Sequence, residues 1–105
     1  MKRSEKQIEA GIALDLRRLG WHVTKTSQHA RPQGMTAGIP DLYAMHPRHG
    51  GIWIEVKTPK GRLRDSQKAW HADAERCGVP VVVARSTADV LGALSLADAP
   101  SALTP

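Results

Sequence analysis

Three charged residues stand in segments that otherwise look like protein core. Asp41 follows Pro40 in a Gly-Ile-Pro-Asp-Leu segment, and Glu55 and Lys57 interrupt an apolar run that begins at Ile52. A buried carboxylate is costly unless something compensates it, and a divalent cation does so well. Two carboxylates on Mg²⁺ or Mn²⁺, with an ammonium beside them, can activate a bound water and neutralise charge on a phosphate. These residue types therefore predict metal-assisted hydrolysis of a phosphodiester.

The strand pattern around Glu55 decides whether these groups can meet. Side chains alternate between faces along a strand, so Glu55 and Lys57 share one face and can aim at the same point. The alternative is that both belong to the solvent face of an amphipathic strand. Asp41, on a neighbouring predicted strand, favours the site. Pro40 fixes φ and donates no hydrogen bond, which pins the strand start before Asp41.

Periodicity and capping signals give the elements that must position these residues. We predict helices over 4–19, 65–77 and 86–94, and strands over 21–26, 39–45, 52–57 and 79–84. Asp65 or Ser66 can cap the second helix, and residues 27–36 form a loop. The first three strands are expected to form an antiparallel meander, and the crossover helix then brings the last strand in parallel. The last strand is wholly apolar, as if covered on both faces. The fold class is α/β, a mixed sheet flanked by helices.

The first helix carries two acids beside an apolar face. Ser4 and Gln7 form a capping-box pair, and Gly20 is a natural stop. Glu5 projects into the middle of the apolar arc and Glu9 lies at its edge. The arc itself comprises Ile8, Ile12, Leu16 and Leu19.

Length and charge limit the classes of protein that remain. A chain of 105 residues has room for one domain, predicted over 1–94 with a flexible tail over 95–105. Lys and Arg outnumber Asp and Glu by 15 to 10, which suits a polyanionic partner, although a basic solvated surface would look the same. The candidates for phosphate contacts are the loop cations Lys25, Arg31, Lys60, Arg62 and Arg64.

Cysteine and histidine usage excludes other metal chemistry. The single Cys77 rules out an intrachain disulfide and a cysteine-built zinc site. The five histidines fit no metal-binding spacing, and we expect them on the surface. No apolar run is long enough to span a bilayer, and the N-terminal residues lack a signal-peptide pattern, so we expect a cytoplasmic protein.

The order and spacing of these residues resemble those of a known family. Pro40-Asp41, followed by Glu55-Val56-Lys57, resembles the signature of PD-(D/E)XK nucleases, and more closely that of their VRR-NUC branch in phages and bacteria. The resemblance runs from about Glu5 to Arg85. It implies a restriction endonuclease-like fold with Mg²⁺ or Mn²⁺ bound by Asp41, Glu55 and the backbone carbonyl of Val56.

The resemblance also implies further roles. Lys57 would act at the nucleophile or the scissile phosphate, and Gln67 would hold a water or a phosphate oxygen. The family uses a glutamate on its first helix, for which we prefer Glu5 and leave Glu9 open.

The implied activity is that of a DNA endonuclease. A stand-alone domain of this size is expected to act as a homodimer on branched or flapped DNA, in the manner of Holliday junction resolvases, in a bacterial or phage-infected cell. Two alternatives remain: a non-catalytic nucleic-acid-binding module, and a nuclease subunit of a larger phage or restriction assembly.

Overall fold

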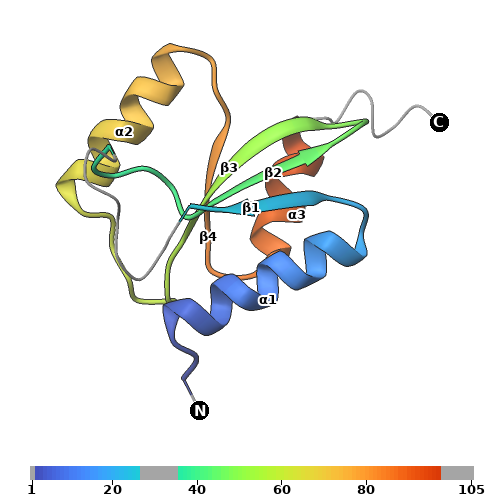
Figure 1. The fold of residues 1–105 in the computed structure, drawn as a ribbon. Coiled ribbons are helices and arrows are strands. Elements are labelled where there is room, and N and C mark those ends of the chain that lie inside the picture. The colour runs from blue at the N-terminus through green and yellow to red at the C-terminus, as the bar shows by residue number, and fades with distance from the viewer. Residues whose placement is uncertain (1, 27–35, 98–105) are drawn as a thin grey trace.

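The structure is a computed structural model that describes residues 2–26 and 36–97 (Figure 1). The order of helices and strands is the predicted one. Its elements are α1 (Glu5–Arg18), β1 (His22–Lys25), β2 (Leu42–His46), β3 (Gly50–Val56), α2 (Asp65–Arg76), β4 (Val81–Ala84) and α3 (Thr87–Ala97).

The four strands form one mixed sheet in the order β1-β2-β3-β4. β2 pairs antiparallel with both β1 and β3, and β4 pairs parallel with β3, so the predicted meander with an added parallel strand is confirmed. Because β1, β3 and β4 run in the same direction, their C-terminal ends lie at the same end of the sheet, where β2 begins. We call this end the site end of the sheet.

Helices cover the two faces of the sheet unequally. α1 and α3 contact each other and pack on one face, where the main hydrophobic core lies, whereas α2 stands against the other face (Figure 1). Alternation along β3 sends Ile52, Ile54 and Val56 into the core. On the α2 face, Trp53 packs edge-on against Trp70, with ring centroids 5.3 Å apart. The predicted division of β3 into two faces is confirmed.

The first helix begins as its capping signal predicts but buries a shorter face. The Ser4 hydroxyl accepts from the Gln7 backbone N–H, and the Gln7 side chain accepts from the Ser4 backbone N–H. Leu19 was expected in the core and is 54% exposed. The helix ends at Arg18, so Leu19 no longer follows the buried face of the helix. The chain then turns at Gly20, which has φ +94°. Glu5 is also exposed, not buried within the apolar arc.

Other predicted boundaries need correction. β2 begins at Leu42 and not at residue 39, so Asp41 precedes the strand. β4 is an edge strand, which leaves Val81–Val83 half-buried instead of covered on both faces. α3 extends beyond residue 94 to Ala97. Residues 27–35 of the predicted loop over 27–36, and residues 98–105 of the predicted tail over 95–105, lie outside the described residues, so the proposed domain boundary stays a prediction.

The start of α2 differs from both predicted caps. Arg64 occupies the cap position and Asp65 is the first helical residue, while Ser66 follows within the first turn. The side chain that completes the cap is Gln67, whose Oε1 accepts from the Arg64 backbone N–H at 2.8 Å. No helix in the described part of the chain is long and apolar enough to cross a membrane.

Candidate active site

Asp41 is held between two strand ends at the site end of the sheet. Its Oδ2 accepts from the Val56 backbone N–H at 2.8 Å, which ties it to the end of β3. Its backbone carbonyl accepts from the Thr26 N–H at 2.8 Å, and the Thr26 hydroxyl donates to the Pro40 carbonyl. The Pro40-Asp41 pair therefore bridges β1 and β3, and the aspartate is fixed although it precedes its strand.

Glu55 is fully buried on the α2 face of β3. Its Oε2 accepts from Nε2 of Gln67 at 3.1 Å, and its Oε1 lies 3.3 Å from Nε2 of His71. Because Oε1 of Gln67 accepts from the Arg64 backbone, the amide can present only its nitrogen to Glu55. The cap of α2 therefore orients the group that holds this carboxylate.

The electrostatics of Glu55 show that the two carboxyl groups lie close together. Burial, and then the hydrogen-bonding carboxyl group and charge of Asp41, raise the pKa of Glu55 from 4.5 to about 8. Lys57 opposes this increase, and Glu5 adds a smaller one. Glu55 therefore keeps its proton at neutral pH, at the point where its carboxyl group approaches that of Asp41. A divalent cation could replace that proton, so this donor set fits Mg²⁺ or Mn²⁺.

Lys57 directly follows β3 and is 5% exposed. Its backbone N–H donates to the Ala84 carbonyl at 3.0 Å, which fixes the residue at the ends of both β3 and β4. Its charge lowers the pKa of Glu55 and, after burial, also contributes to the lowered pKa of His71. The ammonium therefore lies within electrostatic range of both side chains, as expected for a charge that belongs to this site.

His71 is a site residue that the sequence analysis missed. It was expected on the surface, but its side chain is partly buried against Glu55. The available signal was its position one helical turn after Gln67, which places the two side chains on the same face of α2. His46 and His49 instead pack their rings against Trp21 at the other end of the sheet.

Gly38 is a second missed residue, and its role is steric. It has φ +85°, and a Cβ atom placed there would lie 2.1 Å from the Ser66 backbone carbonyl oxygen. The segment that leads into Asp41 therefore lies directly against the first turn of α2, which contains Gln67. Only glycine permits this approach, because both the backbone angle and the space exclude a side chain.

Gly38→Ala should consequently lower both stability and nuclease activity. A non-glycine residue at positive φ costs about 1–2 kcal/mol, and displacement of the α2 backbone adds to that. Gly78→Ala is the matched control, since Gly78 has φ +71° and nothing within 4 Å of the added Cβ. Thermal unfolding and cleavage rates of the two variants measure the steric part. Equal losses would show that the contact with Ser66 does not position the site.

Four of the cations predicted to contact phosphate are exposed, and the fifth, Arg31, lies outside the described residues. Lys25 ends β1 at the site end, where it pairs with Leu42 next to Asp41. Lys60, Arg62 and Arg64 lie in the connection between Lys57 and α2. The structure therefore brings these four residues to the site end of the sheet, where the two carboxyl groups lie.

Within the described ranges, no three His, Cys, Asp or Glu side chains form a group that could hold a metal ion. A metal at Asp41 and Glu55 would therefore need further ligands from backbone oxygens, water or a bound phosphate. This requirement is consistent with the expected participation of the Val56 carbonyl, and it leaves ligand positions open to a substrate.

A mixed sheet of this topology, with Pro-Asp before one strand and Glu-x-Lys at the end of the next, defines a nuclease-type domain of the PD-(D/E)XK class. The VRR-NUC domain family matches residues 6–88, most of the chain, and the protein belongs to that family. A solved structure described as a "VRR_NUC domain" is similar, with 26% identity over 82% of this chain and 88% of the other and a TM-score of 0.66. No curated protein sequence matches the chain.

Proposed function

We propose that this domain is a metal-dependent DNA endonuclease that hydrolyses phosphodiester bonds at Asp41, Glu55 and Lys57. The observation that carries the proposal is the buried Glu55, whose pKa is raised to about 8 by burial and by Asp41. Asp41, Glu55 and the Val56 backbone carbonyl would hold Mg²⁺ or Mn²⁺. When bound, such an ion supplies an activated water and charge stabilisation at the phosphate.

The neighbouring side chains prepare the site for a phosphate. Lys57 contributes a nearly desolvated positive charge, suited to stabilising negative charge that develops on the phosphate. Gln67 donates one amide hydrogen to Glu55, and its second amide hydrogen can reach a water or a phosphate oxygen. Lys25, Lys60, Arg62 and Arg64 are proposed to contact flanking phosphates.

The glutamate of the first helix is assigned to Glu5. Its charge contributes to the raised pKa of Glu55, which supports this assignment although the Glu5 side chain is exposed. Glu5→Gln should therefore reduce the cleavage rate far more than Glu9→Gln, the matched variant one helical turn along. Single-turnover cleavage under saturating Mg²⁺ measures the difference. The reverse ranking would move the assignment to Glu9.

Branched or flapped DNA is the proposed substrate, and a homodimer the proposed active form, in the cytoplasm of a bacterial or phage-infected cell. One cleft can cut one strand per binding event, whereas two clefts related by a two-fold axis can cut both strands of a junction. Sedimentation with and without junction DNA tests the dimer.

Cleavage of a four-way junction, a flap, a duplex and a single strand tests the function directly. Each DNA is incubated with Mg²⁺, Mn²⁺ or EDTA, and we expect cutting of branched DNA with either metal and none with EDTA. Cutting in EDTA would contradict the metal site. Binding without cutting in any metal would instead support the non-catalytic module.

A further inference from the structure

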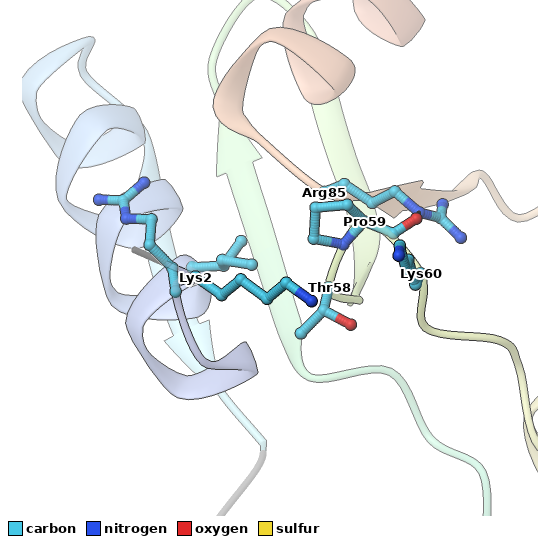
Figure 2. A pocket seen from close by; sticks show the side chains of 7 residues that line it. Lys2, Thr58, Pro59, Lys60 and Arg85 are labelled. Carbon is cyan, nitrogen blue, oxygen red and sulfur yellow. The ribbon is translucent and has the colours of Figure 1, made fainter.

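A basic pocket of about 460 Å³ lies beside the site, between the residues preceding α1 and the connections that follow β3 and β4 (Figure 2). Its cations come from three separate segments of the chain. Figure 2 shows Lys2 extending its ammonium toward Thr58, with Arg85 and Lys60 beside Pro59. None of its lining residues is acidic, and the full set is Lys2, Arg3, Ile8, Thr58, Pro59, Lys60 and Arg85.

Residues 58–60 form one wall of the pocket, and together with Gly61 they make a hydrogen-bonded turn. The Gly61 N–H donates to the Thr58 carbonyl at 2.9 Å. Arg85 holds this turn from β4, since its Nη2 donates to the Gly61 carbonyl at 2.8 Å and its Nε to the Pro59 carbonyl at 3.3 Å. The turn therefore presents Lys60 from a fixed backbone. Arg3 contributes less, because its guanidinium lies along α1, 3.5 Å from the position of a Cβ on Gly11.

The pocket adjoins the proposed cleavage site through the backbone. Thr58 directly follows Lys57, and Arg85 directly follows Ala84, whose carbonyl accepts from the Lys57 N–H. Lys2 lies three residues before Glu5, whose charge reaches Glu55. A nucleic-acid strand with one phosphate at Lys57 would therefore meet this pocket with a neighbouring phosphate.

We propose that the basic pocket is a phosphate subsite, in which Lys2 and Lys60 bind the phosphate that neighbours the cleaved one on the same DNA strand, while Arg85 holds the turn that presents Lys60. The inference rests on the proposed nuclease function and assigns Lys2 to substrate binding and Arg85 to positioning Lys60. Ammonium groups from two separate segments can contact a phosphate from two sides, whereas a flat basic surface contacts it from one side only. The phosphate can be internal or can terminate a strand.

Binding measured without cleavage tests the subsite. Fluorescence anisotropy in EDTA gives the affinity of the wild type, Lys2→Ala, Lys60→Ala and Arg85→Lys for a labelled flap DNA at several salt concentrations. Arg18→Ala, which removes one positive charge at the far end of α1, is the control. We expect Lys2→Ala and Lys60→Ala each to weaken binding on the order of tenfold and to reduce the log–log salt slope by about one unit. Arg85→Lys keeps the charge and should weaken binding because the hydrogen bonds to the turn are lost.

Comparison of DNA with two different 5′ ends distinguishes a terminal phosphate from an internal one. A loss confined to DNA with a 5′-phosphate, compared with a 5′-hydroxyl, indicates a terminal phosphate, and an equal loss on both indicates an internal one. Lys2→Ala and Lys60→Ala that bind as tightly as Arg18→Ala would overturn the subsite, even if the wild type cuts DNA. Weakened binding by these variants, with no cutting by the wild type in any metal, supports the subsite and contradicts the nuclease function.

Discussion

Glu55→Gln should abolish DNA cleavage and at the same time stabilise the metal-free protein at alkaline pH. The amide keeps the shape of the side chain, so Gln67 retains an oxygen to which it can donate. It removes the charge needed to hold a divalent cation, so activity should be lost while DNA affinity in EDTA remains close to that of the wild type. Asp41→Asn should have the same effect on cleavage. Near wild-type cutting by either variant would contradict the metal site.

The stability effect follows from the sign of the pKa shift. The folded pKa of Glu55, about 8, lies above its ordinary value of 4.5, because burial and then Asp41 disfavour the charged form. The buried protonated carboxyl therefore contributes stability that is fully present below pH 4.5 and is lost as the pH rises through 8. A neutral glutamine has no such loss.

Calorimetry in EDTA at pH 5, 7 and 9 measures this effect. The melting temperature of the wild type should fall across this range relative to that of Glu55→Gln, and a difference of about 1 kcal/mol corresponds to roughly 4–8 °C in a domain of this size. Mg²⁺ or Mn²⁺ should restore the wild type and leave the variant unchanged. A difference in melting temperature that does not change with pH would show that Glu55 is ionised in the metal-free fold.

Lys57→Ala should separate catalysis from metal binding. An ammonium cannot ligate a cation, so both carboxylates should still bind Mn²⁺, and more tightly once the neighbouring positive charge is gone. Turnover should fall roughly 10²–10³-fold, the scale of losing one donor to the transition state. Calorimetric Mn²⁺ titration and single-turnover cleavage measure the two effects.

Two further variants keep the Lys57 experiment interpretable. Lys57→Met preserves the apolar stem of this buried side chain, and Lys68→Ala removes an exposed charge on α2 as a control. Joint loss of metal binding and activity in Lys57→Met would make Lys57 a structural support. Unchanged values of both would place the residue outside the chemistry.

Local patterns predicted most of the fold, and they single out the two acids of the candidate site. The alternation in β3 separates the core side chains from Glu55 and Lys57, and the Ser4–Gln7 pair begins α1, because both signals depend on neighbouring residues. The prediction that Leu19 is buried was wrong because it depends on where the helix ends. Helical periodicity cannot show that the helix ends one residue earlier and that the chain then turns at Gly20.

The remaining site residues depend on contacts between distant segments. His71 touches Glu55 only because α2 packs on that face of the sheet. Gly38 is required because its segment lies against Ser66, and the basic pocket exists only where Lys2 approaches Thr58. Apart from the i, i+4 spacing of His71 from Gln67, no periodicity or short motif encodes these pairings, so the sequence alone did not reveal them.

The double hydrogen bond of Gln67 links two events that could otherwise occur separately. One end of the amide caps α2 at Arg64, and the other holds the Glu55 carboxylate. Fraying of the first helical turn therefore also releases the carboxylate, and a well-held carboxylate opposes fraying. The exchange rate of the Arg64 amide hydrogen would thus report the state of a buried acid on a different element. A cation that orders Glu55 would slow that exchange without any contact with the helix.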